Sequence, residues 1–527
     1  MAPANLIPDL RPSPPAEHKF QQQMGQISRH SSVFFAGTVF TAAAGYLFKV
    51  YLARVLGAEA LGIYTLGMTL VGFLGVFNAL GLPQTAVRFV AAYSATGKME
   101  LLRGFIAHGI LFLLATNLLL GGGMLLAGRW IAVHFYHTPA LSQYLGLFAL
   151  IMFLGALTTF LGQVLAGYKD VARRTVITNF IGTPLVMVLT IGLVTLGLGL
   201  WGYIFAQAAA PVVVLVLLAI AVWKLTPRAG RSFSGPLPRL EKQVVSFSAV
   251  AFGVSFLEFT MGQADKVLIG FYLNAREVGI YAVAATLVVF VPIILQSVNQ
   301  IFSPTISDLH ARGDSQLLSR IFQTLTKWIL GLTLPLAGVM ILFSRPLMRI
   351  FGHDFEAGWP ILVIGTLGQL VNCGVGSVGY LLLMSGRERR LIRIQTVMAA
   401  AMIALNLLLI PRWGIIGAAV AAAVTNLASN LWYLKEVRAT MGLFPYTRSY
   451  IRLAPPIAAM ALVLWLLRAG FGGLRPEWVV IGLALVLGYL SFVAVALLVG
   501  LGADDRLIAR AIWERLHGVY RKIEVGL

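Results

Sequence analysis

The stretch KVYLARVLGAEALGIY, residues 49–64, recurs 217 residues further along the chain as KVLIGFYLNAREVGIY, residues 266–281. The two copies align without a gap, and both begin with a lysine and end in Gly-Ile-Tyr. The match extends to the N-terminal side, where Gly45 falls on Gly262. This internal repeat predicts that the two halves of the chain share one architecture.

The chain around the repeat is too apolar for a soluble protein. Hydrophobic residues make up 58% of the 527 residues and charged residues 11%, with a mean hydropathy of +0.85, whereas a soluble chain carries roughly a quarter charged residues. Runs such as 33–56 and 479–501 are apolar on every face, which excludes the alternating pattern of a membrane β-barrel. We therefore predict an all-α membrane protein with about fourteen transmembrane helices, each of about 20 residues.

The spacing of the repeat also predicts the domain organisation. Six helices separate the two copies, and because six is even, both halves insert in the same orientation about a pseudo-two-fold axis along the membrane normal. The expected segments are a disordered cytosolic tail over 1–30, an N-lobe of six helices over 31–225, a cytosolic linker over 226–243, a C-lobe of six helices over 244–440, two further helices over 441–501 and an amphipathic cytosolic helix over 502–527. The last helix is expected either at the anionic membrane surface or docked on the protein.

The basic residues predict topology rather than a nucleic-acid partner. The net charge of +20 is spread over many short loops and is not gathered in one domain. Of the 40 lysines and arginines, three lie within expected spans, eight fall on the side opposite the N terminus, and the remaining 29 fall on the N-terminal side. Positively charged loops stay in the cytosol. We expect a multi-pass protein of the cell's inner (plasma) membrane with cytosolic N and C termini.

Short motifs follow one another along most of the chain in a consistent order. They are Ala53-Arg54-Val55-Leu56-Gly57, Gly81-Leu82-Pro83, Asp265-Lys266-Val267-Leu268-Ile269-Gly270, Ser307-Asp308 and Gly414-Ile415-Ile416-Gly417. Together they resemble the polysaccharide transporter (oligosaccharide flippase) family of the multidrug/oligosaccharidyl-lipid/polysaccharide exporter superfamily. The multidrug branch usually has twelve helices, so the expected fourteen depart from that branch.

The resemblance implies two six-helix lobes around a central cavity, alternating access and no enzyme activity. The implied cargo is a lipid-pyrophosphate-linked oligosaccharide that moves from the cytosolic to the outer leaflet for polysaccharide export. The implied partners are membrane lipids and the polysaccharide polymerase and export proteins. A peptidoglycan-precursor (lipid II) flippase and a cation-coupled multidrug exporter are alternatives. A membrane glycosyltransferase or polymerase is disfavoured, because its long outer loop would need acidic catalytic groups, and only Asp354 and Glu356 are available there.

Two membrane-embedded lysines, Lys49 and Lys266, occupy equivalent positions in the repeat. An intramembrane charge costs roughly 2.5–3.5 kcal/mol on insertion scales unless it faces a cavity or a partner. We predict that both lysines line the central cavity and attract the pyrophosphate of the cargo. Arg54 and Arg88 are predicted to extend this substrate-binding path, with contact to lipid headgroups as the alternative for both.

Glu258 and Asp265 are the acids that fall well inside an expected span. They are seven residues apart and therefore lie within two helical turns on similar faces. One interpretation is that Glu258 binds a coupling ion, H⁺ or Na⁺. The other is an ion pair of Glu258 with Lys266 or Lys49 that holds the empty cavity closed.

The eighth expected helix carries polar residues at i, i+3, i+4 and i+7, and the first three are carboxamides. These are Gln296, Asn299 and Gln300, followed by Ser303. Because a carboxamide both donates and accepts hydrogen bonds, we predict that these three bind sugar hydroxyls. Contacts between helices are the alternative.

Metal and redox cofactors are not expected. His134 and His137 form a His-x-x-His pair, but no further ligand follows nearby. Cys373 is the only cysteine and lies in an expected span, so no disulfide can form within the chain. The cofactor prediction is therefore none, apart from the possible coupling ion.

Overall fold

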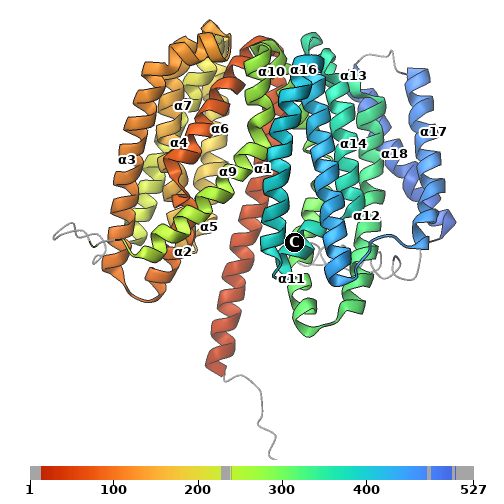
Figure 1. Cartoon of the computed structure of the whole chain (residues 1–527), viewed down its shortest axis with the longest axis horizontal. Coiled ribbons are helices and arrows are strands. Elements are labelled where there is room, and N and C mark those ends of the chain that lie inside the picture. The colour runs from red at the N-terminus through yellow and green to blue at the C-terminus, as the bar shows by residue number, and fades with distance from the viewer. Residues whose placement is uncertain (1–13, 227–237, 239, 472–475, 501–504, 506–527) are drawn as a thin grey trace, which may run out of the picture. The chain divides into compact units, whose positions relative to one another are not determined.

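The computed structural model describes residues 14–226, 238, 240–471, 476–500 and 505. These residues are almost entirely helical and include no β-strand (Figure 1), which confirms the all-α prediction. Most of the predicted linker over 226–243 lies outside the described residues, as does the predicted C-terminal helix apart from Asp505.

The first half of the chain forms seven α-helices joined by short π-helical and 3-10 segments. They are α1 (Pro14–Ala79), α2 (Leu82–Ala95), α3 (Met99–Trp130), η1 (Ile131–Phe135), η2 (Pro139–Tyr144), α4 (Leu145–Gly167), α5 (Val171–Thr175), η3 (Val176–Gly182), α6 (Thr183–Leu193), η4 (Val194–Leu198) and α7 (Gly199–Leu225).

The second half begins at α9 and contains ten described α-helices. They are α9 (Lys242–Tyr272), α10 (Ala275–Val288), α11 (Ile293–Arg312), α12 (Ser315–Leu342), α13 (Ser344–Arg349), η5 (His353–Gly358), α14 (Trp359–Val375), α15 (Val378–Met384), α16 (Glu388–Met441), η6 (Arg448–Leu453), α17 (Ala454–Phe471) and α18 (Glu477–Val499).

The first helix starts earlier than the sequence predicts. α1 begins at Pro14, so residues 14–30, assigned above to a disordered tail, are helical. Proline is tolerated in the first turn because its missing N–H needs no partner there. The residues that follow include Ala16, Glu17 and the glutamines of 21–23, which favour helix. Residues 1–13 lie outside the described part.

Within the described residues, ten helices are long and apolar enough to cross a membrane, or eleven if the bent pair α10 and α11 counts as one span. Val171–Leu225 and Glu388–Met441 contain 55 and 54 residues, far more than the ~20 that one crossing needs. Both are interrupted at glycines with positive φ, 86° at Gly197 and 58° at Gly414, which glycine adopts without steric cost. The count of fourteen transmembrane helices stays a prediction.

The chain divides into two compact units. The first contains Met1–Lys49, Val71–Arg129 and Gln143–Phe256, and the second contains Val50–Leu70, Trp130–Ser142 and Leu257–Leu527. Two short pieces of the first half, 50–70 and 130–142, therefore belong to the second unit. The lobe boundaries predicted from the repeat stay predictions.

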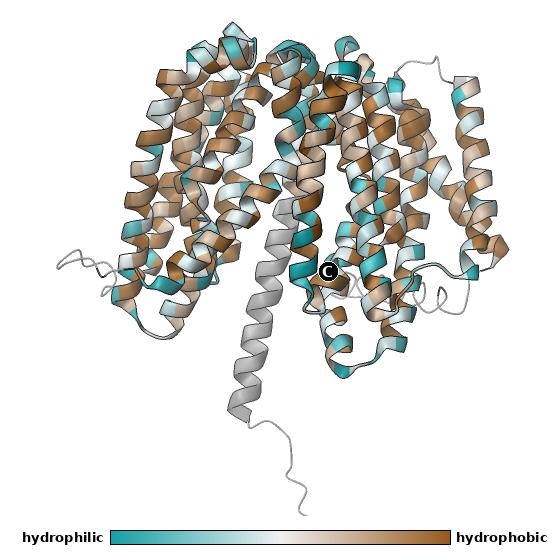
Figure 2. Ribbon diagram, viewed as in Figure 1, coloured by the Kyte–Doolittle hydropathy of each residue, from teal (hydrophilic) through white to brown (hydrophobic). Residues whose placement is uncertain are grey.

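Each unit has its own apolar core and apolar outer faces. In the first unit, Phe105 of α3 and Phe160 of α4 are buried against each other, with ring centroids 6.1 Å apart. In the second, Phe322 of α12 is fully buried among side chains of α11, α15 and α16. Leu126 and Leu498 are 90% and 84% exposed, and apolar residues run along the helices (Figure 2). Such faces suit a hydrocarbon solvent, in which only internally bonded helices are stable.

The last two helices are attached to the second unit. α17 and α18 pack against each other and against α12 (Figure 1). Arg349 of α13 donates two hydrogen bonds to Glu356, both of 2.8 Å, and one to Glu477 at the start of α18. Hydrogen bonds to these two carboxylates raise the pKa of Arg349 above its usual value. This charged cluster therefore holds the start of α18 against α13.

The repeated Gly-Ile-Tyr motif lies at a close helix crossing in the second unit. A Cβ on Gly62 of α1 would overlap the carbonyl oxygen of Ala275 in α10, and a Cβ on Gly279 of α10 would overlap that of Ala58 in α1. Gly62 and Gly279 are 217 residues apart in the sequence, and so are Ala58 and Ala275. The contact is therefore reciprocal, as a two-fold relation between the two copies requires. Glycine permits this approach of two backbones.

We expect Gly62→Ala and Gly279→Ala each to lower the free energy of unfolding by at least about 1–3 kcal/mol, the usual effect of overpacking. The measurement is the apparent melting temperature of the detergent-solubilised protein. Gly75→Ala, also on α1, is the matched control, because its new Cβ meets nothing within 4 Å. Unchanged melting temperatures for both variants would mean that the two backbones are farther apart than described.

Candidate functional site

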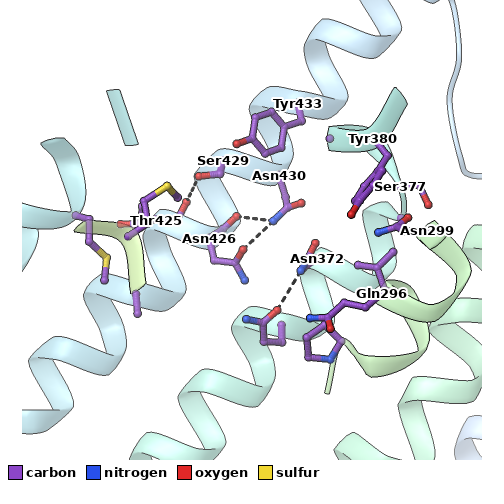
Figure 3. A pocket seen from close by; sticks show the side chains of 18 residues that line it. Gln296, Asn299, Asn372, Ser377, Tyr380, Thr425, Asn426, Ser429, Asn430 and Tyr433 are labelled. Carbon is purple, nitrogen blue, oxygen red and sulfur yellow. Dashed lines mark hydrogen bonds between the residues drawn. The ribbon is translucent and has the colours of Figure 1, made fainter. Parts of the chain in front are cut away.

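A polar pocket of about 430 Å³ lies within the second unit, between α11, α14, α15 and α16 (Figure 3). This volume is in the range of small-molecule binding sites. Its polar lining residues are Gln296, Asn299, Gln369, Asn372, Ser377, Tyr380, Thr425, Asn426, Ser429, Asn430 and Tyr433. Carboxamides dominate this set, and none of the described residues that line the pocket is charged.

The helices beside the pocket are broken. α10 and α11 meet at a bend of 50°, and Pro292, at the start of α11, lines the pocket. α14 ends at Val375, and Gly376 and Ser377 separate it from α15. In a membrane, non-helical backbone is tolerated only where it is buried in protein or lines a cavity. The breaks and the pocket coincide for this reason.

Gly376 is required by the geometry of the α14 break. Its φ is 76°, a conformation that glycine adopts readily and other residues rarely. A Cβ at this position would also collide with the side chain of Thr326 on α12. The break therefore brings the backbone of the pocket wall directly against α12.

Hydrogen bonds among the carboxamides orient the pocket wall (Figure 3). Asn430 Nδ2 donates to the backbone oxygen and to Oδ1 of Asn426, both at 2.9 Å. Asn426 Nδ2 in turn donates to the backbone oxygen of Gly368 in α14 at 3.1 Å. Asn372 Nδ2 donates to Gln369 Oε1 at 3.1 Å. These side chains are held in place before any ligand binds, which lowers the entropy that binding costs.

Three buried oxygens at the pocket make no hydrogen bond within the described structure. They are Asn299 Oδ1, Ser377 Oγ and Thr425 Oγ1. A buried polar atom without a partner costs about 1–3 kcal/mol. These oxygens are closed off in the described conformation, so a hydroxyl group of a ligand would reach them only after the side chains turn toward the pocket.

The structure brings together two of the three amides predicted on the eighth helix. Gln296 and Asn299 line the pocket. Gln300 is exposed and is not among the lining residues. The α-helical rotation between residues 299 and 300 places their side chains about 100° apart, which separates the two environments.

Sequence reasoning missed the wall that α16 provides. Thr425, Asn426, Ser429, Asn430 and Tyr433 all line the pocket. They recur at spacings of three and four residues within the otherwise apolar stretch 415–434 of this helix, which puts them on one face. This polar stripe was readable in the sequence, by the same pattern that marked Gln296 and Asn299.

The structure describes contacts for three of the four predicted cations. Lys49 is half-buried on α1 in the first unit. Lys266 Nζ on α9 donates to Gln263 Oε1 at 2.7 Å. Arg54 Nε donates to the backbone oxygen of Ile350 at 2.7 Å, and the Arg88 guanidinium stacks on the Phe247 ring at 4.6 Å. Both arginines are exposed. That the two lysines share one cavity stays a prediction.

The predicted acids also differ from each other. Asp265 is buried and accepts a 2.6 Å hydrogen bond from the Tyr281 hydroxyl and a 2.7 Å bond from the backbone N–H of Lys266. Glu258 is exposed on α9. Among the described residues no ion pair joins Glu258 to Lys266, whose ammonium bonds to Gln263 instead. Asp265 therefore holds α10 against α9, and the ion-coupling role of Glu258 stays a prediction.

A multi-span helical chain with broken helices around a polar pocket is typical of membrane transport proteins. The solved structure of the lipid II flippase MurJ in its inward closed conformation has the same fold, with a TM-score of 0.68 at 16% identity over 88% of this chain and 97% of MurJ. Residues 27–310, more than half of the chain, match the polysaccharide biosynthesis protein family, and residues 251–412 match the MatE family. The chain belongs to the polysaccharide biosynthesis protein family, which confirms the resemblance drawn from its motifs.

Two relatives come from Haloferax volcanii. The probable flippase AglR is 22% identical over 83% of this chain and 87% of AglR. The probable low-salt glycan biosynthesis flippase Agl15 is 22% identical over 76% of this chain and 81% of Agl15. Both relatives are thus similar over most of their length.

We expect Tyr281→Phe to lower the free energy of unfolding by about 1.5–3 kcal/mol, because the buried carboxylate of Asp265 loses a hydrogen bond to a charged group. The measurement is the apparent melting temperature in detergent. Tyr272→Phe, at the exposed end of α9, is the matched control. Equal melting temperatures for the two variants would show that the bond to Asp265 does not stabilise the fold.

Proposed function

We propose that the protein is an alternating-access flippase that moves a lipid-pyrophosphate-linked oligosaccharide from the cytosolic to the outer leaflet for polysaccharide export. The observation that carries the proposal is the uncharged, carboxamide-rich pocket in the second unit. The names of AglR and Agl15 as flippases support the same class of activity. The proposal involves no covalent chemistry, so the protein acts as a transporter and not as an enzyme.

The pocket suits the saccharide part of such a cargo. A sugar carries many hydroxyl groups, and its cost in a membrane comes from the hydrogen bonds that it loses with water. One carboxamide can replace two of these hydrogen bonds with water, because it donates from its nitrogen and accepts at its oxygen. The unpaired oxygens of Asn299, Ser377 and Thr425 gain partners if their side chains turn toward the sugar. An alkyl chain offers none of these bonds, so the lipid part remains in the bilayer.

The same pocket argues against an organic cation as the cargo. A cation is held best by a carboxylate or by aromatic faces in a site without water. The described lining contains no acidic residue, and its only aromatic side chains are Tyr380 and Tyr433. A peptidoglycan precursor stays as a competing cargo, because it is also a lipid-linked saccharide.

The charged part of the cargo needs a different site. In this proposal, Lys49 and Lys266 attract the pyrophosphate, and their half-buried positions are consistent with ammonium groups at a cavity surface. Glu258 binds the coupling ion, H⁺ or Na⁺, because Asp265 is already bonded to Tyr281. In this proposal the protein lies in the inner membrane, and the polysaccharide polymerase and export proteins are its expected partners.

We expect Asn299→Leu to slow translocation of a lipid-linked oligosaccharide while the protein stays folded. The substitution nearly conserves volume and removes a buried oxygen that has no partner, so the ligand-free melting temperature stays the same or rises. Loss of one sugar hydrogen bond weakens binding by about 1–1.5 kcal/mol, roughly tenfold. The measurement is the flipped fraction of defined, fluorescent lipid-linked oligosaccharides in proteoliposomes.

Gln300→Leu is the matched control, since it changes the neighbouring side chain outside the pocket. It is expected to flip the cargo at the wild-type rate. Equal losses in both variants would contradict the assignment of the pocket to the saccharide. Export of an organic cation by the wild-type protein, with no flipping of any lipid-linked saccharide, would overturn the proposed function itself.

We expect cysteine labelling to confirm the proposed orientation. The native Cys373 is fully buried and gives little background. Glu388→Cys, at the exposed start of α16, should react with an impermeant maleimide only from the cytosol, and Asp354→Cys, in the exposed η5, only from outside. The opposite labelling pattern would reverse the topology that the basic residues predict.

A further inference from the structure

A second cavity lies within the first unit, where α4, α5, η3, α6 and α7 meet. Its volume is about 320 Å³. Part of its lining is apolar and includes Val186, Ala210 and Val214. Its polar lining consists of Arg174 and four threonines, Thr158, Thr159, Thr178 and Thr183. In contrast to the neutral pocket of the second unit, this cavity contains a cation.

The Arg174 side chain is held in position by neutral neighbours. Its Nη1 donates to Gln163 Oε1 on α4 at 3.0 Å. The same side chain lies over Gly162, so that its Nε is 3.4 Å from where a Cβ on that glycine would be. One guanidinium bears five N–H groups, and the bond to Gln163 uses one of them. The guanidinium is therefore fixed in orientation and still has N–H groups that can donate to a ligand.

Arg174 has no counter-ion among the described residues. The adjacent Arg173 pairs with Asp170 at 3.2 Å, and Arg276 and Arg349 also pair with carboxylates. No such pair includes Arg174, whose described side-chain partner is the uncharged Gln163. A half-buried cation without a counter-ion in a membrane segment is costly. It is therefore a position at which an anion would be stabilised.

Two hydroxyl groups complete the donors around the cavity. Thr158 and Thr178 already donate to backbone oxygens, of Gly155 at 3.1 Å and of Arg174 at 2.9 Å. Thr159 and Thr183 have no hydrogen-bond partner among the described residues. Their hydroxyls are free to donate to a ligand. Thr183 starts α6, directly after the π-helical turn η3, a kind of irregularity that is frequent at functional sites.

We propose that this cavity binds a phosphoryl group. Arginine presents its donors in a planar fork that matches two phosphoryl oxygens, and the hydroxyls of Thr159 and Thr183 supply further donors. The apolar residues on the other walls favour a phosphoryl group attached to an alkyl chain, as in an anionic lipid. Free phosphate carries the same recognised chemistry without the chain. The assignment does not depend on the cargo of the neutral pocket.

The test uses the full chain purified in an uncharged detergent, with three probes: sodium phosphate, farnesyl phosphate and a short-chain phosphatidylglycerol. Sodium chloride at matched ionic strength is the reference. We expect at least one probe to raise the melting temperature of the wild-type protein saturably. Arg174→Gln should weaken this binding about tenfold or more, and its ligand-free melting temperature should equal or exceed that of the wild type, because an unpaired cation is removed.

Arg173→Gln is the matched control, because it removes the neighbouring, exposed arginine and should bind like the wild type. Thr183→Val provides a second variant that keeps the side-chain shape and should weaken binding several-fold. A response to sodium phosphate identifies a soluble phosphate site, and a response to the two lipids alone identifies a headgroup site. The proposal is overturned if no probe binds, or if Arg173→Gln and Arg174→Gln weaken binding equally.

Discussion

The backbone of this protein must keep its hydrogen bonds in a medium without water, and the rest of the structure depends on that constraint. It explains why the described chain is almost entirely helical and why its long helices are interrupted at few positions. Gly197 and Gly414 interrupt two helical segments that are each far longer than one membrane crossing needs. Gly376 is different, because it interrupts α14 beside a polar pocket. An interruption at that place is compatible with the membrane only because a cavity and the side chain of Thr326 surround it.

The same constraint decides how much could be predicted from the sequence. Length and apolar composition predict spans, and the repeat predicts which positions are equivalent, as the reciprocal contacts of Gly62 and Gly279 bear out. Polarity on a helix marks a face, and on α11 it marks Gln296 and Asn299, both of which line the pocket. That they bind the cargo stays a prediction. It also marks Gln300, which is not among the lining residues, because the pattern indicates a face and not its exact width. The polar stripe on α16 can be read in the same way, but that it forms the opposite wall of this pocket depends on which helices pack together, which one sequence does not contain.

Charged residues show the limit of prediction more clearly. Asp265 falls well inside an expected span, and Arg54 and Arg88 are predicted to extend the path of the cargo. Each has a partner in the structure: Tyr281, the backbone oxygen of Ile350 and the ring of Phe247. The rule that a charge in or near a membrane needs a partner does not distinguish a ligand from a structural neighbour, because both satisfy a charge equally well. The binding roles of the two arginines stay predictions. Arg174 was overlooked because it follows Arg173 at a helix start and resembles an ordinary topological signal.

Recognition of a cargo by uncharged groups affects how fast a transporter can release that cargo. In a medium of low dielectric constant, a fully desolvated ion pair is strong, and a cargo held that way dissociates slowly. Neutral hydrogen bonds contribute only about 0.5–1.5 kcal/mol each, so a site made of carboxamides reaches specificity by the number and direction of weak bonds. The hydrogen bonds from Asn430 to Asn426 and from Asn426 to Gly368 orient the carboxamides of the pocket wall without a charge. A pocket of this kind can select a saccharide and still release it, which a cycle of loading and unloading requires.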